Sequence, residues 1–328
     1  MSSHRDYGIS VIQDIAASLK EVATRIPESF DQIVNIIINR PKHSRILFCG
    51  VGKAGFVGMK LAATFSSVGL SSFFLHPSEV SHGDLGCVQN EDIIIILSNS
   101  GETEEVVRLV QPFRELGALT IAITANTDST LAGFTDYVIS YGSIKEAGHN
   151  NLAPTSSVTV MIAIGDAIAM SAARALKFSQ FDFGKYHPGG SLGRALLPIR
   201  KVMRTGEYLC IVSCEVLTRD VIKTYAETPG RPGAAIIVDN SGTVMGIFTD
   251  GNLRRLICSD ENRDFLNRSI SSFMSKSPKT INVNLLIRDA LDILSMYQID
   301  QLIVADDYNR PVGLIDIQDV ARVYRGIE

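Results

Sequence analysis

Between residues 45 and 140 the hydrophobic pattern changes period several times. Short apolar runs without polar alternation recur, such as Ile93–Leu97, and strands buried on both faces have this pattern. Between these runs, apolar residues stand three or four positions apart, as in Val106, Val110 and Phe113, which predicts amphipathic helices. The predicted strands are 45–49, 72–75, 93–97, 120–123 and 137–140. This βαβ alternation predicts an α/β fold with a doubly wound parallel sheet.

Longer helical segments flank this region. They are predicted at 8–25, 30–39 and 156–178. The last contains the longest apolar stretch of the chain, but Gly165 and Asp166 interrupt it before it reaches the ~20 apolar residues of a membrane span. We therefore expect no membrane-spanning segment.

After a glycine-rich segment, 187–193, the sequence reads as two similar halves. Val202-Met203 recurs as Phe273-Met274, and Val244–Phe248 recurs as 311–315. The period is longer than that of solenoid repeats, so we expect two copies that pack as one pseudo-symmetric module. The predicted division is a first domain over 1–200 and a second over 201–328, with copies at about 201–265 and 272–328.

The composition narrows the class of protein. Hydrophobic residues make up 45% of the 328 positions and charged residues 20%, which is typical of a globular protein. A net charge of −4 gives no basic footprint for nucleic acid or anionic lipid. The five cysteines are odd in number, and no apolar signal region follows Met1. Reduced thiols and a cytoplasmic location are therefore expected.

The turn after the first predicted strand is a candidate ligand loop with the sequence Gly50-Val-Gly52-Lys53-Ala-Gly55. Its spacing fits a dinucleotide fingerprint, but the second strand ends without the acidic residue that would hold a ribose. Three glycines let the backbone approach a small ligand, and Lys53 adds a positive charge. The alternative interpretation is a plain turn with a solvated lysine.

A second candidate loop follows the most apolar strand, with the sequence Ser98-Asn99-Ser100-Gly101-Glu102-Thr103. Hydroxyl and N–H groups at a helix N-terminus after a buried strand make an anion site, and these suit a phosphate monoester. Alternatively the hydroxyls only cap the helix, although capping accounts for one of the three. One of the glutamates 102, 104 and 105 is a candidate catalytic group.

Further candidates lie after the other strands. The polar loop 145–157 follows the last strand, where doubly wound folds place their ligand crevice, and Glu146 is a candidate base there. Residues Thr155, Ser156 and Ser157 either cap the long helix or close over a ligand. His187 lies in an exposed-looking Pro/Gly segment, which favours a functional role. His76 and His82 share a loop and either contact substrate or bind a transition metal.

Taken together, these motifs resemble the arabinose 5-phosphate isomerase family. The motifs that carry the resemblance, in chain order, are the glycine turn 50–55, His82-Gly-Asp84, the serine-rich loop 98–103, Ala153-Pro-Thr-Ser-Ser157 and His187-Pro-Gly-Gly190. The resemblance covers nearly the whole chain. It implies a flavodoxin-like sugar-isomerase (SIS) domain followed by an α+β pair of cystathionine-β-synthase-type (CBS) repeats.

The resemblance implies an aldose–ketose isomerase that interconverts D-ribulose 5-phosphate and D-arabinose 5-phosphate through an enediol, towards Kdo for lipopolysaccharide. By motif position, the catalytic set falls on Lys53, Glu105, Glu146 and His187. Lys53 is expected to stabilise the oxyanion, either glutamate to act as the carbon base, and His187 to move protons among the sugar oxygens. The substrate-binding residues expected are Gly52, His82, Ser98, Asn99, Ser100, Thr103, Thr155 and Ser156.

The resemblance also implies a homotetramer with shared active sites, in which His187 is the residue most suited to act in a neighbouring subunit. No cofactor is required, but an inhibitory zinc ion could bind through His76. Adenosine-binding CBS copies often carry Thr-x-x-Asp, and here each copy keeps one of the two positions, Thr249 in the first and Asp319 in the second. A regulatory or oligomer-stabilising role with a CBS ligand still unknown is therefore expected.

Two other functions fit the same residues. One is a phosphosugar-sensing regulator that uses the SIS pocket without turnover, although such regulators usually carry a DNA-binding helix-turn-helix instead of CBS repeats. The other is an isomerase paralogue that serves sugar-alcohol metabolism with the same site chemistry. The retained lysine, glutamates and histidine favour catalysis over sensing.

Overall fold

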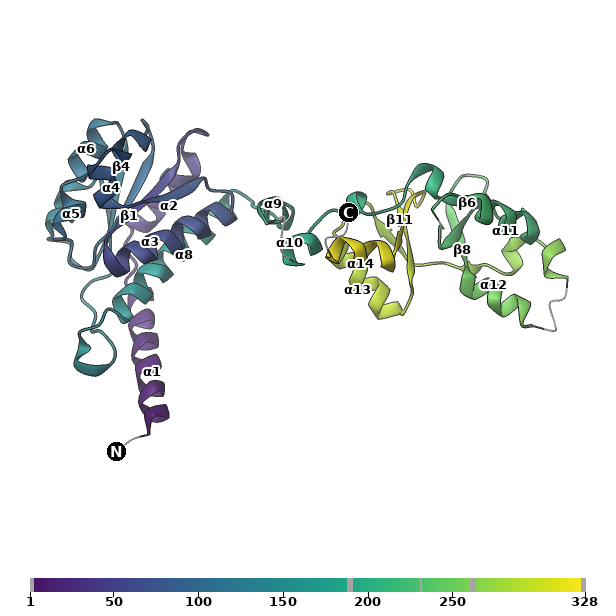
Figure 1. Ribbon diagram of the computed structural model, residues 1–328, viewed down its shortest axis with the longest axis horizontal. Helices are drawn as coiled ribbons and strands as arrows, with labels where there is room; N and C mark the ends of the chain where they lie inside the picture. The colour runs from purple at the N-terminus through teal and green to yellow at the C-terminus, as the bar shows by residue number, and fades with distance from the viewer. Residues whose placement is uncertain (1–2, 188–190, 231, 260–263, 326–328) are drawn as a thin grey trace. The chain divides into compact units, whose positions relative to one another are not determined.

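The computed structural model describes residues 3–187, 191–230, 232–259 and 264–325 (Figure 1). The chain divides into two compact units, Met1–Tyr186 and His187–Glu328. The strands of the first unit are β1 (Ile46–Gly50), β2 (Ser72–Leu75), β3 (Ile93–Leu97), β4 (Leu119–Thr124) and β5 (Tyr137–Ser140). Its helices are α1 (His4–Ala23), α2 (Ser29–Asn39), α3 (Gly52–Ser67), α4 (Pro77–Ser81), α5 (Glu104–Val107), α6 (Val110–Glu115), α7 (Thr130–Phe134), α8 (Ser156–Ala175) and α9 (Gln180–Tyr186).

The five strands form one parallel sheet in the order β2-β1-β3-β4-β5. This is the doubly wound, flavodoxin-like order, which confirms the predicted fold class. All five predicted strands are present. β1 is shifted by one residue, and β4 extends one residue further at each end than the pattern predicts.

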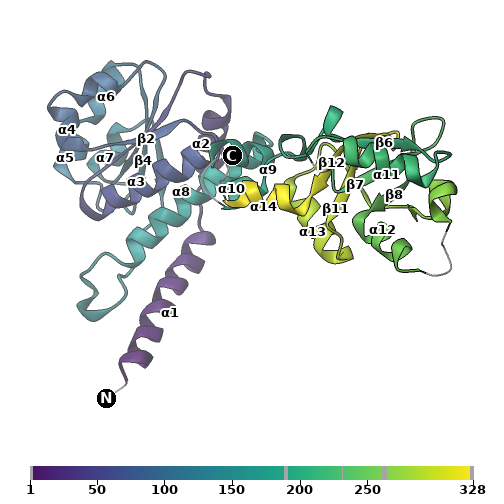
Figure 2. The same cartoon turned by 45° about the vertical axis from the view of Figure 1, so that its right-hand side comes forward.

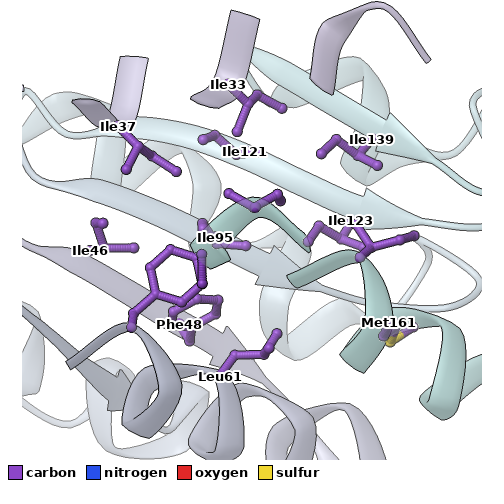
Figure 3. Close-up of a cluster of buried hydrophobic side chains, with 14 of the residues drawn as sticks. Ile33, Ile37, Ile46, Phe48, Leu61, Ile95, Ile121, Ile123, Ile139 and Met161 are labelled. Atoms are coloured by element: carbon purple, nitrogen blue, oxygen red, sulfur yellow. The ribbon is translucent and has the colours of Figure 1, made fainter. Parts of the chain in front are cut away.

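Alternate residues of each strand feed two cores on opposite faces of the sheet. On β1, Ile46 and Phe48 join the cluster under α2, α3 and α8, and this cluster is shown in Figure 3. Leu47 and Cys49 join the cluster under α5 and α6 on the other face. β3 is divided in the same way and is buried along its whole length. Burial on both faces explains why these strands lack a polar alternation.

Helices α3 and α8 run side by side on one face, and both begin at the carboxyl edge of the sheet (Figures 1 and 2). Their close approach depends on Gly165, because a Cβ there would lie 2.4 Å from Leu61 Cδ1. Asp166, the charge that interrupts the apolar pattern of α8, pairs with Lys60 of α3. α8 is long and apolar enough to cross a membrane by length and composition alone, but over half of its apolar window is buried, as in a core helix.

The helical segment after β3 differs from its predicted form. The apolar positions from Val106 to Leu116 predict one amphipathic helix, but the structure divides them into α5 and α6. Pro112 explains the break, since proline has no N–H and its ring clashes with the carbonyl four residues earlier, at Arg108. Only four residues of helix therefore follow the serine-rich loop.

The second unit contains two copies of one β-α-β-β-α order. The first copy has β6 (Cys210–Ser213), α11 (Thr218–Glu227), β7 (Ala234–Val238), β8 (Val244–Thr249) and α12 (Asp250–Ile257). The second has β10 (Thr280–Asn282), α13 (Ile287–Tyr297), β11 (Gln301–Ala305), β12 (Pro311–Asp316) and α14 (Ile317–Arg325). The remaining elements are α10 (Ser191–Ala195), the short strand β9 (Ser275–Lys276) and several 3-10 turns. In each copy the first two strands are parallel, the last two are antiparallel, and an irregularity falls at the same place.

The segment that precedes each copy packs against the other copy. Met274 precedes the second copy and packs against Gly246 of the first copy. A Cβ on Gly246 would lie only 2.3 Å from Met274 Sδ. Met203, which precedes the first copy, packs against Gly313 of the second in the same way, at 2.6 Å. A shared core that includes Ile236 and Ile303 joins the two. The copies therefore form one pseudo-symmetric module, as the sequence repeat predicts.

We expect Gly165→Ala to lower the melting temperature, although alanine favours a helix interior by about 1 kcal/mol. The added methyl group collides with the Leu61 side chain, and overpacking of this kind costs about 1–3 kcal/mol. Gly8→Ala in α1 is the matched control, because its Cβ meets no atom within 4 Å and should raise the melting temperature slightly. Differential scanning fluorimetry of both variants tests this. A Gly165→Ala variant as stable as Gly8→Ala would contradict the close packing of α3 on α8.

Candidate functional site

A cleft of about 360 Å³ lies at the carboxyl edge of the first unit's sheet. Its polar lining includes Lys53, Ser98, Asn99, Ser100, Thr103 and Glu146. The cleft lies where the strand order reverses, since α3 leads from β1 to β2 on one side while β3 pairs with β1 on the other. Doubly wound sheets bind their ligands at this switch point, because the loops after the two strands diverge there.

The serine-rich loop after β3 is held by its own hydroxyl groups. Ser98 is buried, and its Oγ accepts the Gly101 N–H at 3.0 Å and lies 2.9 Å from Thr103 Oγ1. Gly101 has a φ of +71°, and a Cβ there would lie 2.1 Å from Ser129 Oγ. Only glycine fits this position, since a side chain would meet both backbone strain and a collision.

Glu102 binds the start of α7. Its carboxylate accepts hydrogen bonds from Thr130 Oγ1 at 2.7 Å and Thr130 N at 2.8 Å, and these bonds lower the pKa of Glu102. The acidic group therefore caps α7 and anchors the loop. Because α5 has only four residues, any attraction of this loop for an anion depends on its hydroxyl and N–H groups rather than on a long helix.

Glu146 occupies the N-terminus of the 20-residue helix α8. Its Oε2 accepts hydrogen bonds from Thr155 N at 2.7 Å, Ser157 N at 3.2 Å and Thr155 Oγ1 at 3.3 Å. Burial alone would raise the pKa of Glu146, but the hydrogen bonds from Ser157 and Thr155 outweigh it and hold the pKa below its usual range. The carboxylate is therefore ionised at neutral pH beside the cleft.

The glycine turn brings Lys53 to the same cleft. Gly50 and Gly55 touch across the turn, since a Cβ on Gly55 would lie 2.8 Å from the Gly50 carbonyl oxygen. Gly52 has a φ of +59° and opens α3, which places exposed Lys53 in the first helical turn. The turn thus brings Lys53 to the cleft that the serine-rich loop also lines.

Other predicted residues are placed differently. Glu105 and His82 are exposed and are not among the residues that line the cleft. Thr155 binds Glu146, and Ser156 is fully buried with no hydrogen-bond partner for its Oγ among the residues that the structure describes. His187 begins the second unit, and residues 188–190 of its motif lie outside the described residues.

His76 has a structural contact that the sequence does not reveal. Its Nδ1 accepts the Ser78 N–H at 3.3 Å and caps α4. Within the described ranges, no three His, Cys, Asp or Glu side chains gather closely enough to hold a metal ion. The inhibitory zinc ion stays a prediction.

Two features of the cleft are not predicted from the sequence. Part of the lining is apolar and includes Val51, Leu152, Pro154 and Met161. The fully buried Tyr141 donates a hydrogen bond from its hydroxyl to Asn99 Oδ1 at 2.7 Å, behind the cleft. Since a tyrosine at the end of a strand is usually a core residue, no signal in the sequence marks this contact.

Comparison with known proteins places these features in a family. Residues 40–171 match the SIS domain model, and residues 270–326 match the CBS domain model. The chain is 36% identical over 98% of its length to the arabinose 5-phosphate isomerase KdsD of Francisella tularensis, and covers 98% of that protein. It is 37% identical over 94% of its length to the arabinose 5-phosphate isomerase KpsF of Escherichia coli, and covers 94% of that protein.

Among solved structures, an Escherichia coli protein in complex with arabinose 5-phosphate is 34% identical and superposes with a TM-score of 0.52. The match covers 57% of this chain and all of that chain.

We expect Glu146→Gln to lower the melting temperature at neutral pH, and the difference from wild type to shrink below about pH 4.3, the ordinary glutamate value. A carboxylate whose pKa folding depresses stabilises the fold above its unfolded pKa. That stability is lost as the pH falls through the folded pKa. Melting curves from about pH 3 to 7 measure the effect. Glu105→Gln, at an exposed position, is the control and should match wild type throughout. A difference that stays constant with pH would contradict the capping role of Glu146.

Proposed function

Since the chain belongs to the arabinose 5-phosphate isomerase family, with an SIS domain followed by CBS repeats, we propose that it interconverts D-ribulose 5-phosphate and D-arabinose 5-phosphate. One observation carries the proposal. An ammonium group, a carboxylate and a serine-rich anion loop line the same cleft. These are the groups that an enediol isomerase needs.

The phosphate of the sugar binds in loop 98–103, where Ser98 and Gly101 fix the hydroxyl and N–H donors. Carbons 1 and 2 of the bound sugar then point towards Glu146 and Lys53. A base removes a proton from carbon 1 of the ketose, and the electron pair forms the enediolate with negative charge on oxygen 2. The base exchanges this proton with solvent and delivers one to carbon 2, while the proton of oxygen 1 moves to oxygen 2 as the aldehyde forms. No net oxidation occurs, and the ammonium of Lys53 stabilises the charged oxygen.

Glu146 is the better candidate for the carbon base. It lines the cleft and is held ionised, whereas Glu105 is exposed and outside the lining. The hydrogen bonds from the Thr155 and Ser157 N–H groups and from the Thr155 hydroxyl all reach Oε2. His187 is proposed to move protons among the sugar oxygens.

The proposal extends to the assembly and its cellular role. We propose a cytoplasmic homotetramer with shared sites, in which His187 is supplied across a subunit contact. The product would feed Kdo synthesis for lipopolysaccharide. The CBS module would stabilise the oligomer or regulate it through a small ligand.

Deuterium exchange followed by NMR tests the reaction. Purified protein is incubated with D-ribulose 5-phosphate in heavy water, and we expect D-arabinose 5-phosphate with deuterium at carbon 2. Glu146→Gln should slow its formation by about 10²–10⁴-fold, because general-base catalysis contributes that much. Phosphosugar binding, measured by calorimetry, should persist in the variant.

Glu105→Gln is the matched control and separates the alternatives. Full activity of Glu146→Gln together with loss of activity in Glu105→Gln would assign the role of carbon base to Glu105. A wild-type protein that binds the sugar but neither isomerises it nor exchanges protons would be a phosphosugar sensor. If the protein converts a sugar-alcohol-derived phosphate as fast as D-ribulose 5-phosphate, the alternative of an isomerase paralogue in sugar-alcohol metabolism is favoured.

A further inference from the structure

Asn99 lines the cleft with an exposed side chain, yet both of its oxygens are engaged from behind. Its side-chain Oδ1 accepts the hydrogen bond of the Tyr141 hydroxyl at 2.7 Å. Its backbone carbonyl accepts Ala125 N at 3.1 Å and Thr124 Oγ1 at 3.3 Å. An exposed residue at a strand end is normally mobile, and this one is fixed at two points.

These bonds close a ring across the ends of three strands. Asn99 follows β3, Thr124 ends β4, and Tyr141 follows β5. The ring is completed because Tyr141 N donates to the Thr124 carbonyl oxygen at 3.1 Å. A fully buried phenol thus reaches from the core to the back of a cleft-lining amide.

The ring fixes which end of the amide faces the ligand. A primary amide has an acceptor end and a donor end of nearly equal size, and rotation by about 180° exchanges them. Because Oδ1 is held by the phenol, Nδ2 is the end left for the cleft, and among the described residues it makes no hydrogen bond to protein. A phosphosugar presents oxygen atoms, so it is attracted by N–H donors and repelled by a carbonyl oxygen.

We propose that Tyr141 is a positioning residue that holds the Asn99 amide with Nδ2 towards the cleft, where it donates to an oxygen of the bound phosphosugar. The inference rests on the proposed function and adds a residue that contacts no substrate.

The hydrogen bond to Asn99 Oδ1 requires a protonated phenol, since a phenolate has no proton to donate. Burial and the negative charge of Glu146 both raise the pKa of Tyr141, so its hydroxyl remains protonated wherever Glu146 is ionised. Burial in the core, with a smaller contribution from the charge of Glu146, therefore keeps the phenol in the form that donates to Asn99.

A double-mutant cycle tests the proposal with steady-state kinetics on D-ribulose 5-phosphate and calorimetric binding of D-arabinose 5-phosphate. We expect Tyr141→Phe to raise KM and Kd about three- to tenfold, the effect of one neutral hydrogen bond, with kcat changed less than about twofold. Asn99→Ala should weaken binding at least as much. The double variant should equal Asn99→Ala, because Tyr141 acts only through the amide.

Two further variants sharpen the test. Tyr137→Phe, the same change at the start of β5, is the control and should leave KM unchanged, because no hydrogen bond to its hydroxyl is present within the described residues. Asn99→Asp keeps a partner for Tyr141 but turns an oxygen towards the cleft, so it should weaken binding more than Asn99→Ala.

The failures are distinguishable. If wild type neither binds nor converts the sugar, the proposed function fails and this inference fails with it. If wild type is active but the Tyr141→Phe and Asn99→Ala effects multiply, or Tyr141→Phe changes only the melting temperature, Tyr141 is a core residue and the inference alone is overturned.

Discussion

The parallel pairing of β1 with β3 is the constraint on which the site depends. Their register ends with Gly50 opposite Leu97, so the glycine turn and the serine-rich loop leave the sheet at the same level and from adjacent strands. The chain then sends α3 back towards β2, and this opens a gap between the loops instead of covering it. α3 must lie close to the sheet and to α8 for Lys53 to face this gap, which is why glycine recurs at Gly55, Gly58 and Gly165. The chemistry of the cleft is therefore a consequence of strand order and of close helix packing.

The N-terminus of α8 adds an electrostatic constraint. The first turn of a helix has N–H groups without partners, and an anion is stabilised there. Both the carboxylate of Glu146 and a sugar phosphate are anions, and the carboxylate already accepts the N–H groups of Thr155 and Ser157. In the proposed function the phosphate is therefore bound by the loop after β3 instead. The carboxylate and the phosphate would then be held by different parts of one cleft, which separates two negative charges that repel each other. The same hydrogen bonds hold the carboxylate in one orientation and keep it ionised, at the cost of some basicity.

Sequence patterns predict much of this arrangement, and the exceptions have physical reasons. A run such as Ile93–Leu97 has no amphipathic helical alternative, and polar residues that follow buried strands must gather at one sheet edge. Lys53, Ser98 and Glu146 were predictable on that basis. The contact of Tyr141 with Asn99 was not, because it joins residues on strands that only the tertiary fold brings together. The divided helix after β3 was predictable in principle, since Pro112 is visible in the sequence, but the apolar spacing conceals it.

In the CBS module, residues at the positions of the Thr-x-x-Asp pattern make structural contacts. The equivalent positions Asn252 and Asp319 each bind the segment that precedes the other copy. Asn252 Nδ2 donates to Ser275 Oγ at 3.1 Å, whereas Asp319 accepts Arg204 Nε at 2.6 Å and Nη2 at 3.2 Å. Thr249, the other position kept from the Thr-x-x-Asp pattern, caps α12 and donates to Asn252. The last position of the Thr-x-x-Asp pattern thus links each copy to the segment before the other copy. Because one junction uses a neutral pair and the other a two-point ion pair that is largely buried, the two halves of the module are chemically unequal despite their matching backbones. Any ligand that enters the module must therefore meet two different environments, and pseudo-symmetry of fold does not imply two equivalent sites.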